Sequence, residues 1–230
     1  MRINIRDLDK DQAYNDLVQR RKTCNKCNGL CNPSTFDYDS DQIGSWTLWQ
    51  GNLNSDIVVV GQDWGDVTYF EKWKGKDQPK DNPTNENLQR LMEIINIKVE
   101  KPSMDQNHIV FLTNLILCLK TGGLQATVED HWFENCSSIF FRPLMNIIKP
   151  KIVIALGKKV SESILNIYDI PYSKSTPYYE LINKSPVKLT SSLVLFPVYH
   201  CGAGSINRNR PMEEQKDDWR KIAQWLKENN

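Results

Sequence analysis

Four short apolar runs, each separated from the next by segments of helical period, constrain the fold of this chain most. The runs are Ile57–Gly61, Ile109–Thr113, Ile152–Leu156 and Leu193–Val198. Each is short and rich in Val, Ile, Leu or Phe, which is typical of strands buried on both faces of a parallel sheet. Strands that alternate with helices form βαβ units. The pattern therefore predicts an α/β fold, a three-layer α/β/α structure with a central four-stranded parallel sheet.

Amphipathic segments between these runs predict the helical layers. Apolar residues recur at helical spacing in five segments, Leu8–Arg21, Asn85–Ile97, Glu129–Ile148, Lys158–Ile167 and Met212–Lys227. Two long polar stretches, Thr68–Thr84 and Ile170–Thr190, are expected to be loops. No repeat, low-complexity tract or linker divides the chain. We therefore expect a single domain over residues 1–230, with the N-terminal helix and the first cysteines included.

Composition narrows the functional classes without choosing one. The formal net charge is +1 among 230 residues, so a nucleic-acid partner would have to be bound by local basic groups. No apolar run approaches the roughly 18 residues of a membrane span, and the charged N-terminus lacks the apolar core of a signal peptide. We expect an intracellular, cytoplasmic protein. Its six cysteines would be reduced there, which leaves metal binding, catalysis or burial as their use.

Polar side chains follow three of the predicted strands at the point where each strand ends. Asp63, Asn114 and His200 occupy these positions. Individually they have ordinary explanations: a helix N-cap, an Asn bonded to loop backbone, a structural His. The carboxyl ends of parallel strands meet at one edge of a sheet, where α/β proteins bind ligands. If the three strands are neighbours, these side chains form a plausible constellation for breaking the glycosidic bond of a flipped nucleotide.

The cysteines provide an independent pattern. Cys24 and Cys27 form a CxxC pair, Cys31 follows closely, Cys118 lies just beyond the second strand, and Cys136 lies on a predicted helix. Four thiolates can hold a [4Fe–4S] cluster or a zinc ion. The alternative for Cys118 and Cys136 is simple burial, which is common for free cysteine.

The order of these motifs resembles that of the iron–sulfur (family 4) uracil-DNA glycosylases. The matching segments are CNKCNGLC, VVVGQDWGD, FLTNLILC, NCSSIFFRPLMNIIKPKIVIALGKKV and LFPVYHCG. The resemblance covers most of the chain, from Cys24 to about Trp225. It implies a DNA glycosylase that hydrolyses the N-glycosidic bond of uracil or a related pyrimidine. It also implies a structural [4Fe–4S] cluster with the ligands Cys24, Cys27, Cys118 and Cys136, which leaves Cys31 and Cys201 spare.

Two departures from that family bear on which base is excised. The family has Glu-Ala-Pro after the first glycine of its turn, where this chain has Gln62-Asp63-Trp64, similar to the GQDP turn of the family 1 enzymes. The family's His-Pro-Ser is replaced by His200-Cys201-Gly202. Three alternatives stay open: excision of uracil, excision of a modified pyrimidine from foreign DNA such as that of a phage, and a catalytically silent nucleic-acid-binding module.

Each candidate residue has an expected role. Asp63 stabilises the sugar cation and orients water, and His200 stabilises the departing base as a neutral imidazole that donates one N–H. The expected base-binding residues are Gln62, Trp64, Asn114 and Phe70. The expected DNA-binding residues are Gly202, Ser205, Arg208 and Arg210, although the arginines could instead be solvated surface groups. We expect the protein to act on DNA as a monomer.

Overall fold

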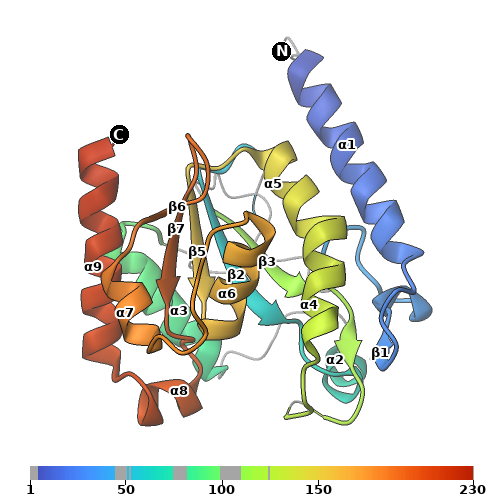
Figure 1. Ribbon diagram of the computed structural model, residues 1–230. Helices are drawn as coiled ribbons and strands as arrows, with labels where there is room; N and C mark the ends of the chain where they lie inside the picture. Colours follow the sequence, from blue (N-terminus) through green and yellow to red (C-terminus); the bar gives the residue numbers. More distant parts are fainter. Residues whose placement is uncertain are drawn as a thin grey trace.

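The computed structural model describes residues 5–44, 51, 53–74, 82–98, 110–123 and 125–229. A five-stranded sheet forms its centre, in the order β3-β2-β5-β7-β6 (Figure 1). The strands are β2 (Ile57–Asp63), β3 (Val110–Ile116), β5 (Ile152–Leu156), β6 (Val187–Lys188) and β7 (Val194–Val198). The four predicted strands are the parallel ones, and the α/β prediction is confirmed. The fifth, β6, is antiparallel to β7, and its two residues are too few to produce a strand pattern in the sequence.

The parallel strands are paired so that their carboxyl ends lie together. Ile57 of β2 is level with Val110 of β3 on one side and with Ile152 of β5 on the other, and Ile152 is level with Val194 of β7. The residues that follow the strands are therefore brought to one edge of the sheet. The predicted site residues lie at this edge.

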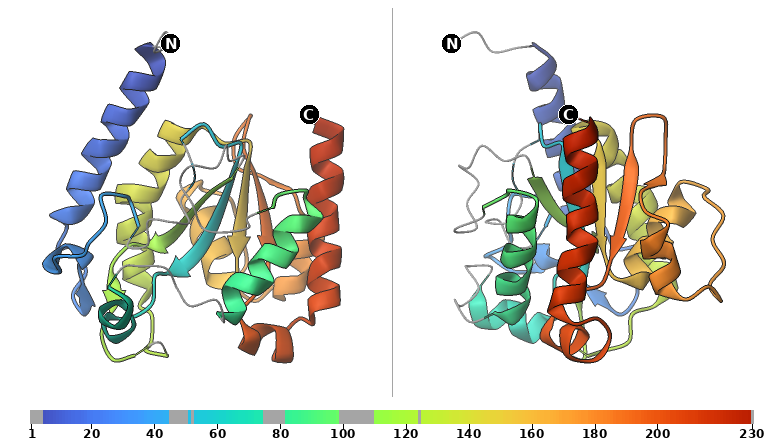
Figure 2. Two further views of the ribbon diagram at one scale, coloured as in Figure 1. Left: turned by 180° about the vertical axis from the view of Figure 1, so that it is seen from behind. Right: turned by 90° about the vertical axis from the view of Figure 1, so that its left-hand side faces the viewer.

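Helices cover both faces of the sheet (Figures 1 and 2). One face carries α1 (Ile5–Lys22), α4 (Asp130–Cys136), α5 (Arg142–Ile148), α6 (Lys158–Ile167) and α7 (Tyr178–Asn183), and the other carries α3 (Pro83–Ile94) and α9 (Met212–Asn229). Alternate residues of β2 supply the two cores: Val58 packs with the first set and Val59 with the second. In the described part of the chain, no helix is long and apolar enough to cross a membrane.

Three segments differ from the prediction. The segment expected to be a single helix over Glu129–Ile148 is α4 followed by a π-helical turn and α5. A short helix, α2 (Val67–Trp73), occupies the start of the predicted loop Thr68–Thr84 because Asp66 caps its first turn: the Asp66 carboxylate accepts from the Tyr69 N–H. Lys76 and Lys80 of that loop lie outside the described residues. The loop expected over Ile170–Thr190 contains α7 and β6.

The N-terminal segment is attached to the rest of the chain by a small second sheet and by a buried ion pair. β1 (Leu30–Cys31) pairs antiparallel with β4 (Leu119–Lys120). At the end of α1, Arg21 donates to both carboxylate oxygens of Asp39 at 2.9 Å and to the carbonyl oxygens of Ser40 and Gln42. The two charged side chains are only 1% and 6% exposed.

We expect Asp39→Ala to destabilise the fold strongly, because it leaves the guanidinium of Arg21 buried without its counter-charge. Removing one partner of a buried pair costs about 3–5 kcal/mol. The measurement is the free energy of unfolding in urea. Asp41→Ala is the matched control: Asp41 pairs with Lys22 but is 90% exposed, so we expect a loss of less than about 0.5 kcal/mol. Equal losses in the two variants would contradict the argument.

Candidate active site

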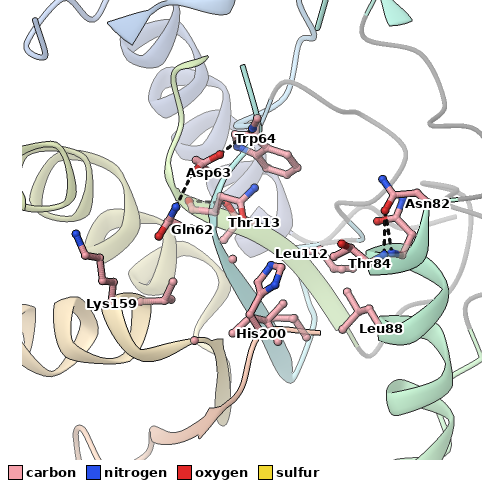
Figure 3. A pocket seen from close by; sticks show the side chains of 18 of the residues that line it. Gln62, Asp63, Trp64, Asn82, Thr84, Leu88, Leu112, Thr113, Lys159 and His200 are labelled. Carbon is pink, nitrogen blue, oxygen red and sulfur yellow. Dashed lines mark hydrogen bonds between the residues drawn. The ribbon is translucent and has the colours of Figure 1, made fainter. Parts of the chain in front are cut away.

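A pocket of about 720 Å³ opens at the carboxyl edge of the parallel sheet (Figure 3). Residues from all four parallel strands or the loops that follow them line it, including Asp63, Asn114, Leu156 and His200. The first turns of two helices complete the wall, with Thr84 and Asn85 from α3 and Lys158 and Lys159 from α6. The structure therefore brings together the three polar residues that the strand ends suggested.

Asp63, the last residue of β2, is held by three donors. The Gln62 side-chain amide donates to Oδ2 at 2.7 Å, the Gly65 N–H donates to Oδ1 at 2.9 Å, and the Lys120 ammonium lies 3.3 Å from Oδ2. The carboxylate is only 8% exposed. A carboxylate has about four acceptor positions. The donors found among the described residues occupy three of them, which leaves room for one more donor, such as a water molecule.

His200 follows β7 and is fixed by the glycine two residues later. The Gly202 N–H donates to Nδ1 of His200 at 3.0 Å. In the neutral ring, Nδ1 is therefore the acceptor and the proton resides on Nε2. A Cβ at Gly202 would lie 2.9 Å from the same Nδ1, so a side chain there would displace the ring. Gly202 itself is buried, which assigns it to the support of His200 and corrects its predicted role in DNA contact.

The surroundings of His200 disfavour its charged form. The ring is accessible from the open pocket. The nearby protein nevertheless displaces much of its water, and this desolvation lowers the pKa of His200 below the ordinary value for histidine. The negative charge of Asp63 acts in the opposite direction and is the smaller effect. The imidazole is accordingly neutral at neutral pH and can donate one N–H.

Asn114 lies beside Gly61 in the ladder between β3 and β2. Its side chain extends over the β2 backbone, and a Cβ at Gly61 would lie 2.1 Å from Asn114 Oδ1. Glycine at position 61 is what allows the amide to occupy this place on the pocket wall. The amide offers both a donor and an acceptor to a ligand.

The aromatic side chains near the pocket differ from the prediction in one case. Trp64 and Tyr69 line the pocket. Phe70 is fully buried and packs against Phe36 and Tyr38, behind the wall. The predicted contact between Phe70 and a base is therefore wrong. Helical geometry explains the difference, because neighbouring residues of α2 point in different directions and Tyr69 takes the pocket side.

The two arginines predicted to contact DNA differ in their contacts and in their exposure to solvent. Arg210 makes a two-pronged ion pair with the buried Asp218 of α9, with contacts of 3.0 and 2.9 Å, and also pairs with Glu214. Its charge is used within the protein, which corrects the prediction that it binds phosphate. Arg208 is exposed and Ser205 half-buried on α8 (Ala203–Arg208), which follows His200. Neither residue lines the pocket, and a DNA contact by either of them stays a prediction.

Two side chains of the pocket have connections that the sequence did not reveal. Gln62, predicted to bind the base, directs its amide to Asp63 instead. Lys120, which the sequence analysis did not single out, lines the pocket and pairs with Asp63. Lys120 lies shortly before a Gly-Gly turn, in a segment without helical or strand periodicity. Only its short distance from Asp63 in the structure identifies it as a residue of the site.

Two of the predicted cysteine ligands, Cys27 and Cys136, are in contact with each other. Cys136 donates its S–H to Cys27, and this bond lowers the pKa of the Cys27 thiol. Burial, together with the smaller effect of the nearby thiols of Cys24, Cys27 and Cys31, raises the pKa of Cys118 to about 12. As the side chains stand, however, the described residues contain no group of three or more Cys, His, Asp or Glu arranged to hold a metal ion.

The charge of Asp63 and the titration of His200 are linked, and this gives a prediction for the free protein. Asp63→Asn should lower the pKa of His200 further, because it removes a negative charge that raises it. The measurement is an NMR titration of the imidazole, which should also show the proton on Nε2. Asp56 pairs with Lys151 at the opposite edge of the sheet. Asp56→Asn should therefore leave the pKa of His200 unchanged. A rise on Asp63→Asn would contradict this electrostatic account.

Comparison with known proteins agrees with this geometry. A search among curated proteins finds no match to the chain. A family model described as the uracil DNA glycosylase superfamily matches residues 48–227, which include every strand of the central sheet and every polar residue of the pocket named above. The chain therefore belongs to the uracil DNA glycosylase superfamily.

Proposed function

We propose that this protein is a DNA glycosylase that hydrolyses the N-glycosidic bond of uracil or a related pyrimidine after the nucleotide is flipped out of the helix. The superfamily acts on DNA. The observation that carries the proposal is the presence of Asp63, Asn114 and His200 in one pocket at the carboxyl edge of the sheet. A carboxylate can stabilise the sugar cation, an amide can read the base edge, and a neutral imidazole can donate to the departing base.

Asp63 acts on the sugar side of the bond. As the bond breaks, positive charge develops on the deoxyribose, and an anchored carboxylate stabilises it without having to reorganise. The donors that the described residues direct at Asp63 leave one acceptor position, which suits the water molecule that attacks the sugar. The buried setting strengthens this interaction because little solvent screens it.

His200 acts on the base side. The departing pyrimidine carries negative charge on an oxygen, and an N–H donor placed there lowers the barrier. The Gly202 N–H holds the ring in the tautomer that presents its proton on Nε2. Asn114 reads the edge of the base with its donor and acceptor, and Trp64 or Tyr69 provides an aromatic surface for stacking. Stacking and these polar contacts offset the few kcal/mol that extrusion of the base costs.

A modified pyrimidine is the second candidate substrate, and the size of the pocket favours it. Pockets for drug-sized ligands span about 300–1,000 Å³. The pocket of about 720 Å³ lies well within that range, which leaves room for a flipped nucleotide with a substituent on its base. Its polar wall, with Thr84, Asn85 and Lys159, suits a substituent that carries hydroxyl groups. The third alternative, a silent binding module, predicts no excision of any base.

We also propose that Cys24, Cys27, Cys118 and Cys136 hold a [4Fe–4S] cluster with a structural role, as in the iron–sulfur subgroup that the sequence resembles. The support is the spacing of the four cysteines, the contact of Cys27 with Cys136, and the nearness of Cys24 and Cys27 to Cys118. Four thiolates are the usual ligands of such a cluster. No step of the proposed reaction depends on it.

Asp63→Asn should abolish most excision while DNA binding persists. The substitution keeps the size of the side chain and removes its charge, and the lost transition-state stabilisation is about 3–4 kcal/mol, or roughly 10²–10³ in rate. The assay is single-turnover excision from DNA that contains uracil and, separately, from DNA that contains hydroxymethylated or glycosylated pyrimidines. Asp56→Asn is the control for a lost surface carboxylate. Near wild-type excision by Asp63→Asn would refute the mechanism.

His200→Ala should also slow excision, but in a manner that depends on the leaving group. A base that is already a good leaving group needs less help from an N–H donor. Such a substrate should therefore restore the excision rate of His200→Ala more than that of Asp63→Asn. The measurement is the ratio of excision rates on a good and a poor leaving group for each variant. Equal ratios for both variants would show that His200 does not act on the base.

The cluster proposal predicts brown protein with about four irons per chain after anaerobic purification. Cys24→Ser should lose iron and unfold more easily, because a missing ligand loosens the segments that a metal centre joins. Cys31→Ser, which removes a neighbouring thiol outside the proposed ligand set, should retain the iron. Colourless protein with one zinc ion would overturn the cluster and leave the proposed site intact.

A further inference from the structure

Lys120 lies deep in the pocket wall and is ion-paired with Asp63. Its ammonium is 3.3 Å from Asp63 Oδ2, and the two side chains are only 5% and 8% exposed. A buried charge is costly unless a partner of opposite charge compensates it. Lysine is among the residues least often fully buried. The pairing is therefore part of how this pocket is built, as the buried Arg21–Asp39 pair is part of how the N-terminal segment is attached.

The backbone around Lys120 is fixed from two sides. On one side, the Lys120 N–H donates to the Gly65 carbonyl oxygen at 3.0 Å, within the turn that follows Asp63. On the other side, Lys120 is paired with Leu30 in the antiparallel ladder of β1 and β4. The adjacent Thr121 hydroxyl donates to the Gly29 carbonyl oxygen at 3.0 Å, which ties the same strand to the N-terminal segment again. The Lys120 backbone is therefore held in a well-defined position, from which the side chain extends to Asp63.

The contacts at Asp63 divide into two kinds. Gln62 and Gly65 are neighbours of Asp63 in the chain, so they move with it. Lys120 comes from a different strand and from 57 positions further along the chain, and it is the charged partner among the three. Lys120 therefore fixes the position of the Asp63 carboxylate relative to the rest of the pocket, which Gln62 and Gly65 cannot do.

We propose that Lys120 is a positioning residue for the glycosylase reaction: it holds the Asp63 carboxylate in the orientation that faces the reacting sugar. This inference rests on the proposed function of Asp63. Hydrolysis needs a carboxylate whose placement is set before the substrate arrives. Lys120 acts through Asp63 and needs no contact with the base or the sugar.

The test compares single-turnover excision rates and DNA dissociation constants of Lys120→Met and Lys120→Arg. A charge-assisted contact of this kind corresponds to about ten- to a hundredfold in rate. We expect Lys120→Met to lower the rate by that factor with little change in DNA binding, and Lys120→Arg, which keeps the charge, to lose less. Lys151→Met is the matched control: Lys151 pairs with Asp56 at the same 3.3 Å, but at the exposed, opposite edge of the sheet. It should retain the wild-type rate.

A double-variant cycle shows whether Lys120 acts through Asp63. In the Asp63→Asn background, Lys120→Met should cause no further loss, since the group that it positions is already gone. Additive losses would overturn the proposal, and so would a Lys120→Met rate within about threefold of wild type. If Lys120→Met does not fold, the double variant, which leaves no unpaired charge, and Lys120→Arg still decide the question.

A measurement without substrate separates this inference from the proposed function. The carboxyl ¹³C resonance of Asp63 in the free protein should shift in Lys120→Met and stay in place in Lys151→Met, since only the first changes the contacts of the carboxylate. A wild-type protein that excises no base refutes the proposed function. If the wild-type protein is active but the Asp63 resonance does not shift in Lys120→Met, the role of Lys120 is refuted and the proposed function is not.

Discussion

The pairing of β2 with β3 on one side and β5 on the other is the constraint on which the rest of the site depends. β2 is paired on both edges, and its parallel register with β3 sets Gly61 beside Asn114. The same register places Asp63, two residues later, in the wall of the pocket. A shift of one residue would exchange the faces of the strand, so that Val58 and Val59 would trade places between the two cores and Asn114 would no longer lie beside Gly61. The apolar side chains that hold the core thus also fix the chemistry at its edge.

The sequence predicted the layers well and the details around the site less well. Parallel strands are recognisable because their apolar runs are continuous, and the helix over Lys158–Ile167 was predicted at its observed bounds because its period is regular. The residues at strand ends could be identified for the same reason. Phe70 and Arg210 were misjudged because their directions depend on tertiary packing, against Phe36 and Tyr38 in one case and Asp218 in the other. Periodicity in a sequence carries no information on such contacts.

Lys120 illustrates a second limit of the sequence. A catalytic carboxylate can be inferred from a strand end, but its partner comes from a strand of two residues whose pairing with β1 is set by the N-terminal segment. That segment, which contains Cys24 and Cys27, therefore helps to hold the strand that carries Lys120. Trp132 of α4 donates to its Asn28 carbonyl oxygen, so a helix of the main layer supports the strand pair that in turn supports the pocket.

The outer strand β6 has a consequence for how the molecule meets its neighbours. A sheet that ended at β7 would present five residues of unpaired backbone, rich in apolar side chains, to any other chain. β6 covers Val194 and Leu195 of that ladder and is itself only two residues long, one of which is the exposed Lys188. Short, charged borders are poor templates for intermolecular strand addition. At high concentration, this side of the sheet should therefore resist the edge-to-edge association that leads to aggregates.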